Sequence, residues 1–381
     1  MSAKPLPLAG LRILAVEQYG AGPFASMHLA DLGAEVVKIE SPGGGDVSRA
    51  TGPHFLGEQD SQFFQTFNRN KASVVLDLKS QSGRADFERL VASADAVLNN
   101  LRGDQPAKLG LTYEALAAIK PSIVCAHLSA YGRDNERAAW PGYDYLMQAE
   151  AGFMDLTGEP NGPPTRMGLS MVDYMTGVTL ATGLLAGIIG ALRTGRGRDV
   201  DVSLFDTALF QLTYPATWYL NGGHVTTRQA RSAHPATVPC QIFPSADGHV
   251  FVMCMTDKFW QALLAEIGLP ELRELRFADA AQRRQNKVEL IALLDAEFAK
   301  RSSQDWMEAL AGKLPIAPVL TLKEALDSPY AARVGMIQDL AHPAAADFRV
   351  LANPIKLDGQ RMAGRGCAAL GADNTRLLGA G

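Results

Sequence analysis

The sequence predicts an α/β fold in which a Rossmann-like large domain with a parallel sheet carries a smaller α+β domain. Short β-rich runs alternate with helical patterns in the first half of the chain. After residues 221–223 the composition changes to a polar loop and then to charged amphipathic helices. Strands separated by helices are typical of a parallel sheet covered on both faces. With 381 residues and 47% hydrophobic content, the chain is long enough for two domains.

Each element of the first half follows from its own pattern. Runs rich in β-branched residues predict strands, and the periodic apolar runs between them predict helices. The expected strands are Leu11–Glu17, Glu35–Glu40, Ser73–Leu78, Ala96–Asn99 and Ile123–Leu128, and the expected helices are Phe24–Leu32 and Gly83–Ala94.

The second half predicts a strand pair followed by helices. The pair covers Cys240–Phe243 and His249–Met255, and apolar residues at helical spacing predict a helix over Gln282–Arg301. Thr321 and Glu324 form a capping box that opens a further helix. We therefore expect a large Rossmann-like domain over residues 1–200, a linker over 201–224, a small domain over 225–320 and a C-terminal return to the large domain over 321–381.

The segment Met175–Leu192 is mostly apolar and nearly long enough to span a membrane. It also contains threonines and four glycines, which let neighbouring backbone approach closely. We expect a helix buried on all sides of a globular protein rather than a membrane span.

Composition restricts the partners. The net charge of −4, with acids and bases interspersed, supplies no basic field for nucleic acid, so a small molecule is the expected ligand. The N-terminus lacks the long apolar run of a signal peptide, and the four cysteines lie far apart, which predicts a reduced, cytoplasmic protein. No Cys or His spacing is typical of a protein-held metal, so no metal is expected.

The loop Gly20-Ala21-Gly22-Pro23 follows the first strand and opens a helix, and Glu40 ends the next strand. This matches the dinucleotide fingerprint G-x-G-x-x-G/A, in which backbone N–H groups at a helix N-terminus meet a phosphate. Pro23 removes one such N–H group. A tight turn without a ligand, a different nucleotide-bearing ligand and a main-chain contact to the reacting part of a substrate all stay open.

Three clusters of basic or amide side chains accompany the strands. They are Asn68–Lys71, Asn99–Arg102 and Lys108–Gly110. The carboxyl ends of parallel strands are where ligands bind in open α/β sheets, so Asn99–Arg102 suits a phosphorylated ligand. Each cluster alone also fits a solvated loop.

Asp173 is the residue at which we expect chemistry. It lies between a glycine- and proline-rich loop and the apolar helix, which would limit hydration and allow a carboxylate to attack an activated acyl group. An Asp just before a helix is equally typical of an N-cap, and the two roles are compatible. The sequence has no ATP-binding loop and no serine nucleophile elbow, so the energy of the reaction must arrive in the substrate.

Taken in order, these motifs resemble the family III CoA-transferases, the group that includes formyl-CoA:oxalate and carnitine CoA-transferases. The resemblance covers nearly the whole chain. It is carried by Gly10–Leu14, Ala21–Pro23, Asp31–Glu40, Gly45–Arg49, Asn70–Lys71, Leu76–Lys79, Asn100–Arg102, Leu109–Gly110 and Gly158–Asp206.

The resemblance implies a site, a reaction and an assembly. It makes Asp173 the nucleophile, which forms an acyl anhydride and then an aspartyl-CoA thioester, with CoA or acyl-CoA as substrate, no permanent cofactor and no metal. It also implies an interlocked homodimer of ring-shaped chains. The implied CoA-site residues are Asn70, Lys71, Asn100, Leu101, Arg102 and Lys108, with the backbone at Gly20 and Ala21 near the acyl oxygen.

Departures from the family narrow the function. Related α-methylacyl-CoA racemases carry Gly-His-Asp where this chain has Gly142-Tyr143-Asp144, and a tyrosine is a poor base at neutral pH. Formyl-CoA:oxalate enzymes have a glutamine at the position of Gly20 and a glycine-run flap where this chain has Arg228–Pro235, which argues against oxalate as the preferred acceptor. This chain also lacks the basic residue that some members carry, because it has Ser41 at that position.

We therefore expect a CoA-transferase that moves CoA from an acyl-CoA to a small carboxylic acid. Arg166, Arg228 or Arg231 would meet a second carboxylate if the acceptor is a dicarboxylic acid. The alternatives are an acyl-CoA racemase, a nicotinamide-dependent dehydrogenase and a CoA-binding protein without catalysis.

Overall fold

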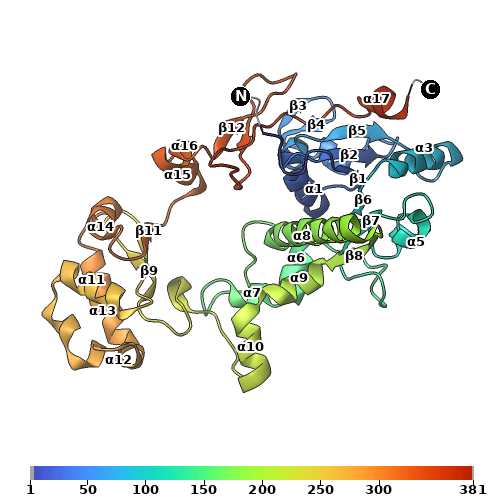
Figure 1. Ribbon diagram of the computed structural model, residues 1–381. Helices are drawn as coiled ribbons and strands as arrows, with labels where there is room; N and C mark the ends of the chain where they lie inside the picture. The colour runs from blue at the N-terminus through green and yellow to red at the C-terminus, as the bar shows by residue number, and fades with distance from the viewer. Residues whose placement is uncertain (1–3, 380–381) are drawn as a thin grey trace. The chain divides into compact units, whose positions relative to one another are not determined.

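The computed structural model describes residues 4–379, so the first three residues of the N-terminal segment, on which the expectation of no leader partly rests, lie outside the described residues. The chain divides into two compact units. Unit 1 comprises residues 1–151, 168–213 and 329–381, and unit 2 comprises 152–167 and 214–328 (Figure 1). The predicted division differs at its borders, because residues 152–167, 214–224 and 321–328 belong to unit 2 and residues 201–213 to unit 1.

Unit 1 is built on a six-stranded sheet in which every neighbouring pair of strands is parallel. In chain order the sheet strands run 3-2-1-4-5-6, the order of a doubly wound Rossmann sheet. Across the sheet they are β5 (Ala72–Val75), β2 (Glu35–Glu40), β1 (Arg12–Val16), β6 (Ala96–Asn99), β7 (Val124–Ser129) and β8 (Arg198–Ser203). The predicted parallel sheet is confirmed, whereas β8 lies beyond the strands that the sequence predicts.

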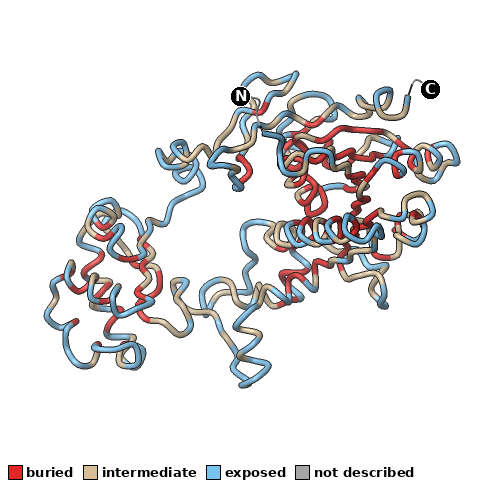
Figure 2. Tube along the Cα trace, in the orientation of Figure 1, coloured by how far each residue is buried: buried red, intermediate tan, exposed pale blue. Residues whose placement is uncertain are grey.

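Helices cover both faces of this sheet, and its strands other than the edge strand β8 are the most continuously buried part of unit 1 (Figure 2). Helices α1 (Ala21–Asp31) and α8 (Met171–Thr194) pack together on one face. On the other face, Phe87, Leu90 and Val91 of α3 (Gln81–Ala92) join the core formed by strand side chains. The remaining helices of unit 1 are α2 (Gln62–Asn68), α4 (Gln105–Lys108), α5 (Tyr113–Leu116), α6 (Asp144–Glu150), α9 (Leu204–Gln211), α16 (Pro329–Arg333) and α17 (Asn374–Leu378).

Helix α8 is long and apolar enough to pass a test for membrane spans by length and composition. Its glycines explain its place on the sheet: a Cβ at Gly177 would lie 2.8 Å from Ala21 O, and one at Gly187 would lie 2.8 Å from Val124 Cγ1. The expectation that the helix is buried on all sides is wrong for the described chain, because Val178, Ile189 and Leu192 are 48%, 49% and 72% exposed. The covered faces of the helix are those toward α1, the sheet, α6 and α9.

The C-terminal segment is attached to the edge strand β5. The backbone N–H groups of Ser73 and Val75 donate to the side chains of Asp373 and Asn374, at 3.0 and 2.9 Å. These contacts cover backbone groups that an edge strand otherwise leaves unpaired. Two small antiparallel pairs complete unit 1: β3 (Phe55–Gly57) with β4 (Asp60–Ser61), and β12 (Ile337–Asp339) with β13 (Arg349–Leu351).

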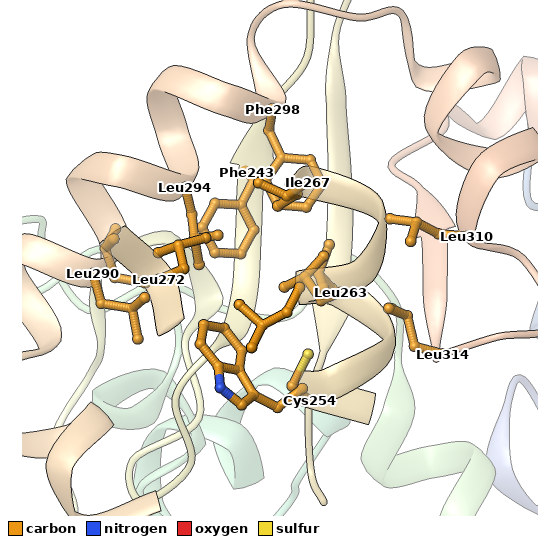
Figure 3. Close-up of a cluster of buried hydrophobic side chains, with 14 of the residues drawn as sticks. Phe243, Cys254, Leu263, Ile267, Leu272, Leu290, Leu294, Phe298, Leu310 and Leu314 are labelled. Atoms are coloured by element: carbon orange, nitrogen blue, oxygen red, sulfur yellow. The ribbon is translucent and has the colours of Figure 1, made fainter. Parts of the chain in front are cut away.

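Unit 2 is an α+β unit with its own core. Its antiparallel sheet has the order β11-β10-β9, and apolar side chains from the sheet and from α11, α13 and α14 pack together, among them Phe243, Leu263, Leu294 and Phe298 (Figure 3). The strands are β9 (Cys240–Pro244), β10 (His249–Met253) and β11 (Ile316–Pro318), and the helices are α7 (Phe153–Leu156), α10 (Thr213–Gly222), α11 (Asp257–Ile267), α12 (Ala280–Gln285), α13 (Lys287–Phe298), α14 (Ser303–Leu310) and α15 (Leu322–Leu326).

Two predictions in unit 2 can be compared with its helices. The single helix predicted over Gln282–Arg301 is two helices, α12 and α13, that meet at Asn286. The capping box of Thr321 and Glu324 is confirmed at the start of α15.

Candidate active site

A cavity of about 960 Å³ lies in unit 1 at the carboxyl ends of the sheet strands. Residues 18–21 after β1 and 100–102 after β6 line it, and β1 and β6 are the neighbours between which the strand order reverses. In open α/β sheets, ligands bind at this reversal point. Leu128, Ser129 and Ala130 at the end of β7 and Asp173 in α8 complete much of the wall.

The loop between β1 and α1 is held from three sides. Asn100 accepts from the backbone N–H of Gln18 at 2.9 Å and donates to Gln18 O at 2.7 Å. Asp46 accepts from the backbone N–H of Tyr19 at 3.0 Å, and the buried Lys38 donates to Glu17 O at 3.0 Å. These bonds fix the backbone that leads into Gly20 at the cavity wall.

Asp173 lies in the first turn of α8 and is not its N-cap, because Ser170 holds that position. The backbone N–H of Asp173 donates to Asp144 Oδ2 at 3.0 Å. Within residues 4–379, no group hydrogen-bonds to the Asp173 carboxylate. The carboxylate lies against Gly20, since a Cβ added there would be 2.8 Å from Asp173 Oδ2. The lack of a side chain at position 20 therefore leaves the carboxylate its place in the cavity.

The electrostatic setting of Asp173 disfavours its charged form. Burial first, and the negative charge of Asp144 second, raise the pKa of Asp173 to about 7. Asp144 is 3% exposed and lies in the first turn of α6. A carboxylate with a raised pKa that has no hydrogen-bond donor is a more basic and more nucleophilic oxygen than an ordinary solvated one.

The structure brings six of the nine predicted site residues together. They line the cavity from three segments of unit 1: Gly20, Ala21, Asn100, Leu101, Arg102 and Asp173. Arg102 Nε lies 3.4 Å from Asp104 Oδ1. The other oxygen of that carboxylate forms an ion pair with Lys108 Nζ at 2.6 Å. Lys108 itself is exposed and does not line the cavity.

Asn70 and Lys71 do not line the cavity, and the structure gives them other partners. Lys71 is fully buried, and its ammonium donates to Glu17 Oε1, Pro23 O and Asn68 Oδ1 at 2.8, 2.9 and 2.9 Å. All three of its N–H groups are therefore occupied beneath the first turn of α1. Asn70 donates to Asp31 and accepts from the backbone N–H of Arg365.

Glu40 does not act as the acidic residue of a dinucleotide site. Both of its carboxylate oxygens accept from Arg49 at 2.8 Å, and Ser73 donates to it at 2.6 Å. The side chain is buried, so it has no free face for a ribose. The fingerprint therefore marks a strand-to-helix turn at the cavity and not a nicotinamide site.

All three arginines considered for a second carboxylate have partners within unit 2. Arg228 donates to the backbone carbonyls of Glu159, Gly162 and Pro163. Arg231 pairs with Asp295 at 2.6 Å. Arg166, also in unit 2, donates to Met167 O.

Sequence reasoning missed several residues that shape the cavity. Asp144 belongs to the Gly142-Tyr143-Asp144 motif. The sequence offered a reason to consider Tyr143, the counterpart of a racemase histidine, but no role for Asp144 was predicted. Gln18, Trp140 and Leu204 also line the cavity. A signal for Asp144 was present, because an acidic residue that begins a helix often bonds a backbone amide. Among the described residues no group of three or more His, Cys, Asp or Glu is arranged to hold a metal ion.

Comparison with known proteins gives a consistent result. The model of CoA-transferase family III matches residues 8–374. The chain is 33% identical to the succinate–glutarate CoA-transferase of Agrobacterium fabrum over 88% of this chain and 85% of that one. It is 35% identical to the acetyl-CoA:oxalate CoA-transferase of Acetobacter aceti, over 94% and 91%. A crystal structure of a CAIB/BAIF family protein from Brucella suis superposes with a TM-score of 0.84 at 31% identity, over 98% and 99%.

Proposed function

The chain belongs to CoA-transferase family III, and we propose that it moves CoA from a small acyl-CoA such as succinyl-CoA to a small dicarboxylic acid, with Asp173 as covalent nucleophile. Both named relatives act on dicarboxylates, glutarate in one and oxalate in the other. The observation that carries the proposal is the Asp173 carboxylate, which faces the cavity without a hydrogen bond from any described residue.

The proposed reaction exchanges one thioester for another. A carboxylate oxygen of Asp173 attacks the donor's thioester carbon, the C–S bond breaks, and CoA leaves as a thiolate with the electron pair. The thiolate attacks the aspartyl carbonyl of the mixed anhydride, which releases the donor acid and leaves an aspartyl-CoA thioester. The acceptor carboxylate attacks that thioester and expels the thiolate, which then attacks the acceptor's acyl carbon and frees Asp173.

Backbone groups at the start of α1 are the proposed stabilisers of the acyl oxygen. The first N–H groups of a helix have no intrahelical partner, and Gly20 and Ala21 line the cavity beside Asp173. Each attack places negative charge on a carbonyl oxygen, which such donors stabilise. Asn100 supports this role because its amide fixes the loop that leads into Gly20.

The CoA moiety is proposed to follow the wall formed by Asn100, Leu101 and Arg102. Arg102 offers a partly exposed guanidinium for phosphate oxygens. Lys108, at the end of α4, pairs with the same Asp104. Lys71 then supports the cavity indirectly, because it binds Glu17 and the carbonyl of Pro23 next to the loop that lines it.

We also propose a homodimer of interlocked chains and a reduced, cytoplasmic setting. The apolar face of α8, with Val178, Ile189 and Leu192 exposed, supports a contact with another copy. All four cysteines are free and buried, which suits a reducing compartment.

The test is to incubate the protein with succinyl-CoA and a panel of acids and to identify new thioesters by mass spectrometry. We expect glutaryl-CoA and other dicarboxylyl-CoA products to exceed those from monocarboxylic acids of equal length, with oxalate as the short comparison. Asp173→Asn is expected to retain CoA binding and to lose transfer by more than about 1,000-fold, because the nucleophile is gone. Retained turnover in this variant would falsify the covalent route, and equal use of both acid classes would contradict the dicarboxylate preference.

A further inference from the structure

Asp144 is a buried carboxylate that faces the reactive one. Its Oδ2 accepts the backbone N–H of Asp173 at 3.0 Å, and its Oδ1 accepts from Gln148 Nε2 at 2.6 Å. It is 3% exposed and has no ion-pair partner among the described residues. Two acidic side chains that share one cavity wall without a cation between them are costly to keep charged.

The surroundings offer little else to explain this arrangement. The other titratable or charged groups on segments near the two carboxylates are Tyr19, Arg102, Tyr143, Tyr145, Tyr174 and Asp206. Of these, none shifts the pKa of Asp173, which responds to burial and to the charge of Asp144. The hydrogen bond to the Asp173 amide could be made by a neutral side chain, so the charge of Asp144 needs its own explanation.

We propose that Asp144 is a positioning residue that fixes the first turn of α8 and, through its charge, favours the covalent form of Asp173 over the resting carboxylate. This inference rests on the proposed function. In the anhydride and in the aspartyl-CoA thioester Asp173 carries no charge, so its repulsion with Asp144 exists only in the resting enzyme and ends when the carbon–oxygen bond to the acyl group forms. The electron pair leaves with the CoA thiolate, and no proton or oxidant is needed.

The same charge has opposite effects at low and high pH. Near neutral pH it keeps part of Asp173 protonated, which removes nucleophile. At higher pH, where Asp173 is ionised, it makes the carboxylate more basic and its acylation more favourable. A residue that only shaped the backbone would not have opposite effects on activity at neutral and at higher pH.

Asp144→Asn and Asp144→Ala separate the two roles. Asn keeps an oxygen for the Asp173 amide and loses the charge, so we expect the acid limb of kcat/KM to move down by roughly one pH unit and the plateau above pH 8 to fall about 10-fold. Ala also leaves the amide unpaired, so its plateau should fall further, about 100-fold. The fraction of protein carrying aspartyl-CoA after mixing with succinyl-CoA, measured by intact mass, should be lower for Asn than for wild type.

A matched control is Asp247→Asn in unit 2. Asp247 also accepts a backbone N–H across elements, from Ser303 at 2.8 Å, and it does not line the cavity. Its acid limb, plateau and covalent fraction should equal those of wild type.

The proposal is overturned if Asp144→Asn keeps the wild-type acid limb and the wild-type covalent fraction, or if Asp144→Ala turns over like wild type. If Asp144→Ala does not fold, the Asn variant decides. Failure of the proposed function is a separate result, because it would appear as turnover in Asp173→Asn whatever position 144 carries.

Discussion

The buried Asp173 carboxylate lowers the stability of the folded chain once it is ionised. Its pKa is raised to about 7, so the folded chain holds its proton more tightly than the unfolded chain does. Between about pH 4 and 7 the folded state therefore binds more protons, and this group makes the free energy of unfolding fall as pH rises. Above pH 7 the full penalty of a buried, repelled carboxylate is present.

Asp173→Asn should therefore stabilise the fold. We expect a gain of about 1 to 4 kcal/mol at pH 8, which shrinks toward zero near pH 4. Chemical denaturation of both proteins at the two pH values measures it. A variant that is less stable than wild type at pH 8 would contradict the assigned environment of the carboxylate.

Gly20→Ala should impair the site. A Cβ there would lie 2.8 Å from Asp173 Oδ2, so Gly20→Ala must displace the carboxylate or the loop. We expect kcat to fall about 10- to 100-fold, since an error near 1 Å in a reacting group has effects of this size. The control is Gly43→Ala, where an added Cβ meets no atom within 4 Å. Equal activity of both variants would show that the cavity does not need this clearance.

The sequence predicted the members of this site better than their roles. Six of the nine expected residues line one cavity because they end parallel strands or begin a helix, and those positions follow from the chain order. Lys71 could not be placed from the sequence, because a basic residue beside a strand is normally solvated. Here the Glu17 carboxylate, which is buried beneath α1, draws the ammonium inward.

Helix α8 connects Asp173 to the sheet. Its glycines let the helix approach β7 and β8 closely. This packing positions Asp173, which lies in the first turn of the same helix. The sequence predicted close approach from these glycines, but it could not show which face they form. Helical spacing alone does not reveal that one apolar face stays uncovered in the chain.

Gly187→Ala should destabilise the fold by about 1 to 3 kcal/mol, because the new Cβ would lie 2.8 Å from Val124 Cγ1 in a packed core. Gly190→Ala in the same helix is the matched control, since its nearest atom would be 3.9 Å away. That change should be neutral or stabilise by up to about 1 kcal/mol through helix propensity. Thermal unfolding of both variants compares them, and equal melting temperatures would contradict the packing of α8.

At the scale of the whole molecule, the chain builds one unit from three separated segments. Residues 329–381 return to unit 1, where Asp373 and Asn374 bind the backbone of β5. Strand alternation predicted the parallel sheet, but the place of residues 152–167 in unit 2 could not be predicted. That placement depends on long-range contacts, such as Arg228 with the carbonyls of Gly162 and Pro163.

The proposed interlocked dimer predicts a specific exchange behaviour. Light scattering should give twice the chain mass of 40.8 kDa at all dilutions tested. Tagged and untagged proteins mixed in the folded state should form no mixed dimers, whereas unfolding and refolding them together should. A monomer, or mixed dimers formed without unfolding, would contradict interlocking.

The proposed mechanism requires Asp173 to become covalently bound to acyl and CoA groups. The most direct measurement is to mix the protein with succinyl-CoA, trap with hydroxylamine and map the modified peptide by mass spectrometry. We predict a hydroxamate on Asp173 alone, at a level that depends on the acyl-CoA and that is absent from Asp173→Asn. A modification at another residue, or transfer to an acceptor acid with no modification at position 173, would contradict the account.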